Sequence, residues 1–162
     1  MKDEKVRKLV FAALMTAVTT VATAVLYIPL PYGFANLGDA AVLLSGGLIG
    51  GPFGVLAAAV GSALADIVLG FTVYAPATFV IKGGMAALFM AIYGKKHTVL
   101  RCVLAAVLAE TMMVFGYFLY ETVLYGAPAA AMSVLGNAVQ GGIGAALACI
   151  LLPLSEKVRI FK

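Results

Sequence analysis

The chain has 162 residues, of which 64% are hydrophobic and 11% are charged, and its mean hydropathy is +1.09. A soluble domain contains about 25% charged and about 45–50% apolar residues, so this composition excludes a soluble globular protein, a disordered chain, a collagen-like repeat and a disulfide scaffold. The length fits about one domain, and the composition indicates a single-domain integral membrane protein.

The basic residues are grouped along the chain. The chain has 11 Lys and Arg residues, and all of them but Lys82 lie in three clusters, at positions 2–8, 95–101 and 157–162. Basic residues mark the cytoplasmic flanks of membrane helices, so we expect both termini and the central cluster to be cytoplasmic. The formal net charge of +4 therefore reflects topology, and nucleic acid is not expected as a partner.

Proline, glycine and basic residues divide the apolar sequence into six segments, because helices stop at such residues. We expect helices over residues of about 6–27, 39–49, 52–70, 76–93, 98–125 and 129–153. The first segment also resembles a signal peptide, but its cleavage would leave an odd number of spans. The predicted fold class is therefore an all-α integral membrane protein, a six-helix bundle with both termini cytoplasmic.

The second helix is shorter than the roughly 20 residues that a span needs. We expect it to pack against the outer loop at residues 29–33, with Asp39 as its N-cap. If it were joined to the third helix, the chain would cross five times and the basic termini would lie on opposite sides.

Small residues recur four positions apart on several predicted helices, and such pairs let helix backbones approach closely. Most of them are expected to pack inside the bundle. Ala13 and Ala17, on the first helix, are the candidate pair for an outside partner, because that helix needs fewer internal contacts.

Polar side chains in the apolar segments concentrate toward the expected outer side. With a rise of about 1.5 Å per residue, Glu110 lies about 18 Å above the start of the fifth helix and Tyr117 about 28 Å above it. On the sixth helix, Asn137 and Gln140 lie about 12–18 Å below the outer end. Because the inner half is almost entirely apolar, this pattern predicts an outward-facing cavity with a closed floor.

Buried charges in a membrane are costly unless they are paired, hydrated or functional. Glu110, Asn137 and Gln140 lie too deep for water, so a ligand or one another must satisfy them. Asp66 and Lys82 lie at similar depth, and they either form a structural ion pair or bind ligand. Glu121 lies near the outer surface, where a solvated carboxylate is the ordinary interpretation.

No catalytic pattern is present in the sequence. It contains no phosphate-binding loop, no zinc-ligand spacing and no nucleophile next to a base. We therefore expect neither an enzyme nor a cofactor or metal, and any active transport must be driven by a partner or by an ion gradient.

Four runs of sequence resemble one family of membrane proteins. They are Asn36-Leu-Gly-Asp39-Ala-Ala-Val, Gly46-Gly-Leu-Ile-Gly-Gly-Pro-Phe-Gly54, Ser62-Ala-Leu-Ala-Asp66 and Tyr74-Ala-Pro-Ala-Thr-Phe-Val-Ile-Lys82-Gly. The chain resembles the S components of energy-coupling factor (ECF) vitamin transporters, in the riboflavin-type branch, from Val6 to Pro153 and most strongly over residues 36–94. The family's Ala-x-x-x-Ala signature matches Ala13-Leu-Met-Thr-Ala17.

The resemblance implies a six-helix subunit in the plasma membrane of a prokaryote that binds a vitamin or vitamin precursor from outside. It implies docking through Ala13 and Ala17 on a transmembrane coupling (T) subunit, which is attached to two cytoplasmic ATPases. Family pockets use the outer loops and helices four to six. Together with the depth argument, this gives as candidate substrate-binding residues Asn36, Tyr74, Lys82, Glu110, Tyr117, Asn137 and Gln140.

The sequence indicates a family but does not indicate one substrate. An acid, an amide and a lysine suit a small hydroxylated heterocycle such as pyridoxine or hydroxymethylpyrimidine, by analogy with the family. The alternative is a self-contained secondary transporter or channel for a small polar solute. The sequence shows neither an inverted repeat nor a midplane pair of broken helices, and this argues against that alternative. A membrane scaffold without ligand is disfavoured by Glu110 and Asn137.

Overall fold

The computed structural model describes residues 2–30, 33–94 and 97–158, and over these ranges it is a bundle of six helices with one small hairpin. The long helices are α1 (Lys2–Ala24), α3 (Gly51–Val68), α4 (Ala75–Tyr93), α5 (Val99–Tyr125) and α6 (Ala127–Val158). These five contain segments long and apolar enough to cross a membrane. The all-α membrane fold is thus confirmed.

The remaining helix, second in chain order, is short and lies in the centre of the bundle. It consists of α2 (Gly38–Leu44), continued by one π-helical turn, η1 (Ser45–Ile49). It packs against α6, α1 and α4, rather than mainly against the outer loop as the sequence suggested. The reason is its composition: Gly38 to Leu43 are all buried, so the helix fills the middle of the bundle instead of resting on its end.

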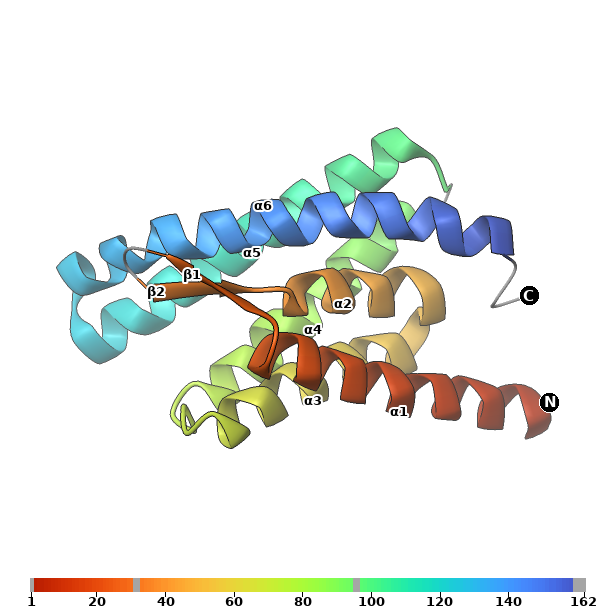
Figure 1. Ribbon diagram of the computed structural model, residues 1–162, viewed down its shortest axis with the longest axis horizontal. Helices are drawn as coiled ribbons and strands as arrows, with labels where there is room; N and C mark the ends of the chain where they lie inside the picture. Colours follow the sequence, from red (N-terminus) through yellow and green to blue (C-terminus); the bar gives the residue numbers. More distant parts are fainter. Residues whose placement is uncertain (1, 31–32, 95–96, 159–162) are drawn as a thin grey trace.

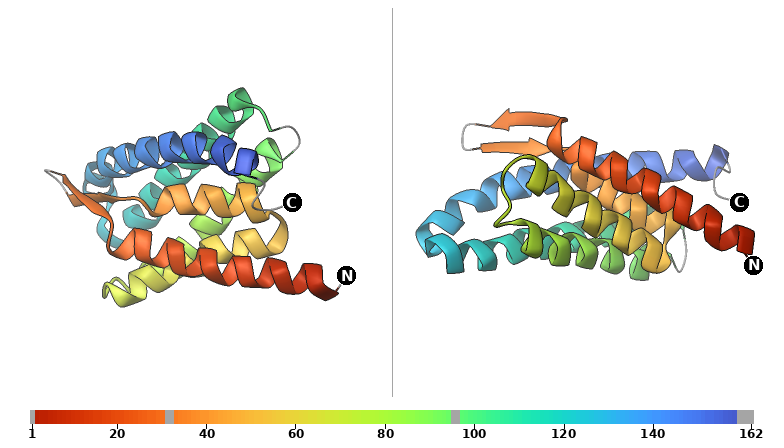
Figure 2. Two further views of the ribbon diagram at one scale, coloured as in Figure 1. Left: turned by 45° about the vertical axis from the view of Figure 1, so that its right-hand side comes forward. Right: turned by 90° about the horizontal axis from the view of Figure 1, so that it is seen from below.

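The chain reverses direction at each connection, so the two ends of the bundle differ (Figures 1 and 2). The start of α1, the end of α4, the start of α5 and the end of α6 lie at one end. The hairpin, the α3–α4 connection and the α5–α6 turn lie at the other. The basic side chains described at α1 and at the start of α5 therefore share one end, as expected for a cytoplasmic face. Lys95 and Lys96 lie outside the described residues.

The segment after α1 forms strands rather than helix and loop. Strands β1 (Tyr27–Leu30) and β2 (Gly33–Asn36) pair antiparallel, with Tyr27 opposite Asn36. Helix α1 ends at Ala24, three residues earlier than the sequence suggested, because the residue before Pro29 favours extended backbone and Pro29 has no N–H to donate. The hairpin places Asn36 against α6.

The helix ends otherwise follow local sequence. Pro76 occupies the first turn of α4, where its missing N–H costs nothing. Gly50 and Gly51 have φ of +62° and +58°, which permits the sharp break between η1 and α3. Helix α6 runs through Pro153 to Val158, five residues beyond the expected end.

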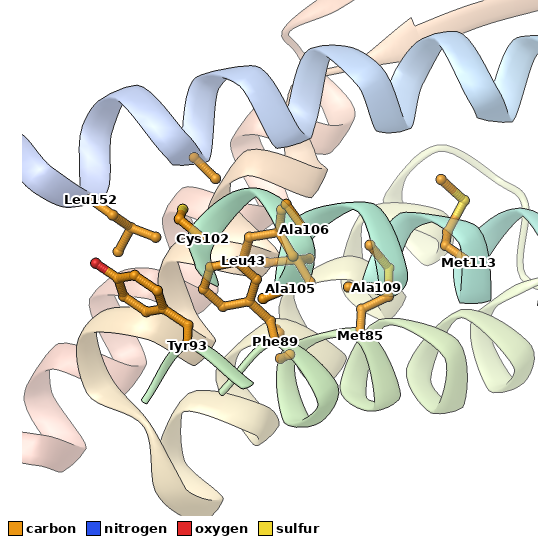
Figure 3. Close-up of a cluster of buried hydrophobic side chains, with 14 residues drawn as sticks. Leu43, Met85, Phe89, Tyr93, Cys102, Ala105, Ala106, Ala109, Met113 and Leu152 are labelled. Atoms are coloured by element: carbon orange, nitrogen blue, oxygen red, sulfur yellow. The ribbon is translucent and has the colours of Figure 1, made fainter. Parts of the chain in front are cut away.

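The apolar core occupies the half of the bundle near the chain termini. Figure 3 shows Phe89 and Tyr93 of α4 packed beside Leu43 of α2, Cys102 of α5 and Leu152 of α6. Alanines at positions 105, 106 and 109 let α5 approach closely. Cys102 and Cys149 do not form a disulfide with each other. This packed layer closes the bundle below the polar residues.

Candidate functional site

A cavity of about 280 Å³ lies above the apolar core, between the halves of the helices nearest the hairpin. Its walls come from α1, β2, α3, the α3–α4 connection, α4, α5 and α6. The lining residues are Thr23, Asn36, Ser62, Asp66, Leu69, Phe71, Tyr74, Thr78, Lys82, Tyr117, Glu121, Ser133, Gly136, Asn137 and Gln140.

A chain of polar contacts crosses one side of the cavity from β2 to α4. Asn36 Nδ2 donates to Gln140 Oε1 at 2.9 Å, and Gln140 Nε2 donates to Asp39 Oδ2 at 2.8 Å. Lys82 Nζ donates to the other oxygen of Asp39 in an ion pair. Asn36 Oδ1 also accepts from the backbone N–H of Gly38 at 2.9 Å, at the start of α2. Buried polar groups thus satisfy one another here.

The expectation that Asp39 caps α2 is wrong, and of the two alternatives left open for Asp66 and Lys82 the structural ion pair is not formed. The N-cap of α2 is Leu37, and Asp39 is buried inside the bundle. The buried ion pair of Lys82 is with Asp39 and not with Asp66. The reason is that α2 occupies the centre of the bundle, which brings its first turn next to α4 and α6.

Glu110 lies beside this chain of contacts but does not line the cavity. It is 6% exposed, and neither carboxylate oxygen has a hydrogen-bond partner among the described residues. It packs against α6 at two glycines: a Cβ added to Gly141 would lie 3.0 Å from its Oε2, and one added to Gly144 would lie 3.0 Å from its Oε1. The same added Cβ on Gly144 would lie 2.7 Å from Asp39 Cβ. Glu110 therefore sits next to Asp39, behind the cavity wall.

Tyr117 forms part of the wall between α4 and α5. Its hydroxyl and that of Thr78 are 2.9 Å apart and share a hydrogen bond. Lys82 Nζ lies 5.5 Å from the centre of the Tyr117 ring, within the range of a cation–π contact. These contacts fix the ring beside the ion pair.

The end of the cavity nearest the α3–α4 connection is held together by Glu121. Tyr74 donates to Glu121 Oε1 at 3.3 Å, and Ser133 of α6 donates to Glu121 Oε2. Burial, a hydrogen bond with Tyr125 and the charge of Glu121 all raise the pKa of Tyr74, so its hydroxyl stays protonated and able to donate. Glu121 is thus half-buried and bonded, not simply solvated as the sequence suggested.

Two parts of the wall have polar groups without protein partners. Asn137 of α6 lines the cavity, and none of the hydrogen bonds found among the described residues involves its side chain. On α3, Ser62 Oγ and Asp66 Oδ2 are buried and have no hydrogen-bond partner in the described part of the chain. These are the groups left available to a ligand.

A comparison with known protein families identifies the family of this chain. A family model described as "ECF-type riboflavin transporter, S component" matches residues 3–157. The chain belongs to this family.

A relative in Pyrococcus woesei, described as an "Uncharacterized protein in gap 3'region", is 35% identical over 148 residues. The match covers 85% of this chain and 99% of the relative. That description assigns no activity, so the family match carries the assignment. The protein is an S component of an ECF transporter and a multi-pass membrane protein. Its family consists of substrate-binding transport subunits, not enzymes, which associate with a T subunit and ATPase subunits.

Six of the seven substrate-binding candidates of this S component line one cavity, and Glu110 does not. Spacing along the helices predicted that Tyr117, Asn137 and Gln140 lie in the outer half and that Glu110 shares a stripe of α5 with Tyr117. It did not indicate that the first turn of α2 packs beside Glu110, outside the cavity lining. Ser62 lines the cavity but was not predicted to do so, although Ser62 and Asp66 are polar residues one turn apart in an otherwise apolar helix.

The docking candidates Ala13 and Ala17 lie on the surface of the S component. Both are exposed, whereas Thr16, Thr19 and Thr20 of the same helix face α3. Thr20 Oγ1 donates to the carbonyl of Gly61 at 2.9 Å. The fully buried Thr19 is rotated about 160° around α1 from Ala17, so the alanine pair is left uncovered by the other helices.

Proposed function

We propose that this S component captures a small vitamin or vitamin precursor in the cavity and delivers it to an ECF importer. One observation carries the proposal: a cavity with a polar lining lies at the end of the bundle opposite the chain termini, above a packed apolar core. With the termini cytoplasmic, the cavity lies in the outer half of the membrane. A closed floor suits a subunit that binds its substrate and depends on partners for release.

The substrate that the cavity favours is a single-ring heterocycle such as pyridoxine or hydroxymethylpyrimidine. The volume of about 280 Å³ lies at the lower end of the range of ligand pockets, about 300–1,000 Å³. A compact ring with hydroxyl or amino substituents fits this size better than the three-ring system of riboflavin, after which the family is named. Tyr74 and Tyr117 supply aromatic surface, and Asn137 supplies both a donor and an acceptor.

The remaining candidates act mainly by holding the wall in place. Asn36, Gln140 and Lys82 line the cavity but already bond to one another or to Asp39. Glu110 lies next to Asp39, behind the wall. Replacing any of these four changes the shape or the charge of the wall or of its surroundings.

The proposed partners are a T subunit in the membrane and two cytoplasmic ATPases. The exposed pair Ala13 and Ala17 supports docking through α1, because small residues on a helix surface permit close contact with another helix. The described residues include no metal-binding group of three or more His, Cys, Asp or Glu, and no cofactor is proposed.

Equilibrium binding by the purified protein tests the proposal. Titration with pyridoxine, hydroxymethylpyrimidine and riboflavin in detergent should give saturable binding to one of the two single-ring compounds. Cells expressing the S component with a T subunit and ATPases should accumulate that compound, and cells lacking the ATPases should not. Uptake without the ATPases would instead favour the alternative, a self-contained secondary transporter.

A further inference from the structure

The α3 wall of the cavity carries polar groups that the protein itself leaves unsatisfied. Ser62 and Asp66 are four residues apart, so they lie on the same face of α3, one turn from each other. Both line the cavity. Ser62 is 1% exposed, and neither its Oγ nor Asp66 Oδ2 has a hydrogen-bond partner among the described residues. A buried acceptor or hydroxyl without a partner is destabilising, so these atoms need a partner from outside the chain.

The other polar groups of the cavity do not supply that partner. Lys82 is committed to Asp39. Glu121, the second carboxylate on the wall, already accepts from Tyr74 and Ser133. Thr78 is close enough to interact with the Asp66 carboxylate but leaves Oδ2 without a bond. The α3 wall thus presents an acceptor that no other group of the cavity wall satisfies.

The charges on the lining residues also favour a ligand that donates hydrogen bonds to the α3 wall. Asp66 and Glu121 are negative, and Lys82 is the one basic residue among the described residues that line the cavity. Because the charge of Lys82 is matched by Asp39 behind the wall, an excess of negative charge faces the cavity. An anionic ligand would meet repulsion there, whereas a positively charged group or a pair of N–H donors would be attracted.

We propose that Ser62 and Asp66 form a ligand subsite that selects a heterocycle bearing an amino group or a basic ring nitrogen. This inference rests on the proposed function and narrows its substrate class. The Asp66 carboxylate accepts from the amino or ring N–H group, and the Ser62 hydroxyl either donates to or accepts from the neighbouring ring atom. Asn137 on α6 contacts the ligand from another wall of the cavity.

The experiment compares two probes of nearly equal size. They are 4-amino-5-hydroxymethyl-2-methylpyrimidine and 5-hydroxymethyl-2-methylpyrimidine, which has a hydrogen atom in place of the amino group and so offers no N–H donor. Each is titrated by calorimetry into the full-length protein in detergent. Wild type should bind the amino compound at least tenfold more tightly, since an unpaired buried acceptor costs about 1–3 kcal/mol, or roughly 5–150-fold in affinity.

The variants assign the preference to α3. Asp66→Asn keeps the size of the side chain but replaces one acceptor with a donor, so the preference for the amino compound should be lost or inverted. Ser62→Ala should reduce it several-fold. Ser155→Ala, which removes a hydroxyl near the far end of α6, should keep the wild-type preference. Size-exclusion profiles of all variants check that each protein is folded.

Equal binding of the two probes by wild type would overturn the subsite, as would binding of neither. An unchanged preference in both Asp66→Asn and Ser62→Ala would also overturn it. These outcomes are separate from a failure of the proposed function. A protein that binds pyridoxine and supports ATPase-dependent uptake, yet does not distinguish the probes, retains the function and lacks the subsite.

Discussion

Lys82 of α4 and Asp39 of α2 form an ion pair in the middle of the bundle, where their side chains are 5% and 1% exposed. The pair joins the short central helix to a long one. Gln140 of α6 donates to the same aspartate, so three helices meet at one carboxylate. A carboxylate and an ammonium group removed from water are tolerated only together, so each residue fixes the position of the other.

The first prediction is that removing one member of this pair destabilises the protein strongly. Lys82→Met leaves Asp39 buried without its cation, and loss of one partner of a buried pair costs about 3–5 kcal/mol. The double variant Lys82→Met/Asp39→Leu should lose less than Lys82→Met alone, because it removes the uncompensated charge. Unfolding in detergent with increasing denaturant measures each free energy.

The exposed ion pair between Lys8 and Glu4, at 3.4 Å, supplies the control. Lys8→Met should change the free energy of unfolding by less than about 1 kcal/mol, as is usual for surface pairs. If Lys82→Met were no more destabilising than Lys8→Met, the ion pair would contribute nothing to the position of α2.

The second prediction concerns two glycines on α6 that differ only in what faces them. A Cβ on Gly144 would lie 2.7 Å from Asp39 Cβ and 3.0 Å from Glu110 Oε1, whereas one on Gly142 would meet nothing within 4 Å. Gly144→Ala should therefore destabilise the protein by about 1–3 kcal/mol, as overpacking does. Gly142→Ala should be neutral or slightly stabilising, because alanine favours helix over glycine. Thermal unfolding of both variants decides between these expectations, and equal effects would contradict the close packing at Asp39.

The fold was accessible from sequence because membrane helices are set by local properties. Length, apolar composition and the positions of Pro76 and of Gly50-Gly51 are read directly along the chain, and these fix where helices stop. The hairpin was missed because two four-residue strands, one of them containing Pro29, give too weak a signal after a long apolar helix.

The partners of the buried charges were not accessible in the same way. Depth along a helix and the face on which a residue lies both follow from residue number, but the element that packs against that face does not. Asp39 was therefore assigned to a cap, and Glu110 to the cavity, although packing of α2 at the centre of the bundle brings the two together. The sequence predicted a short second helix, but nothing in its pattern indicated that this helix lies in the centre of the bundle.

The third prediction tests which end of the bundle is outside. In a variant with Cys102 and Cys149 replaced by alanine, single cysteines at Thr72 and Ala127 should react with an impermeant thiol reagent added to intact cells. Both positions are exposed at the cavity end of the bundle. A cysteine at Thr98, exposed at the end near the termini, should react only after the membrane is opened. Labelling of Thr98→Cys in intact cells would invert the topology.

The fourth prediction tests the docking surface. The double variant Ala13→Trp/Ala17→Trp should abolish uptake by the assembled transporter and leave binding by the isolated subunit unchanged, since large side chains hold apart two helices that meet through small residues. Val18 is also exposed, but it is rotated about 100° around α1 from Ala17, so Val18→Trp is the matched control. Co-purification with a T subunit measures docking directly. If the double variant still co-purified and transported, another face of the subunit would make the contact.

The last prediction separates a residue that contacts the ligand from one that supports the wall. Asn137 lines the cavity without a partner among the described residues, so Asn137→Ala should weaken ligand binding at least tenfold, within the roughly 5–150-fold that an unpaired polar group costs. Glu110→Gln should weaken binding less, because Glu110 lies behind the wall and acts only through Asp39. Leu135→Ala, a truncation at an exposed position of α6, should leave the affinity unchanged. Calorimetric titration of the four proteins with the ligand that wild type binds gives the order. A larger loss in Glu110→Gln than in Asn137→Ala would mean that the ligand reaches past the observed wall and contacts Glu110 directly.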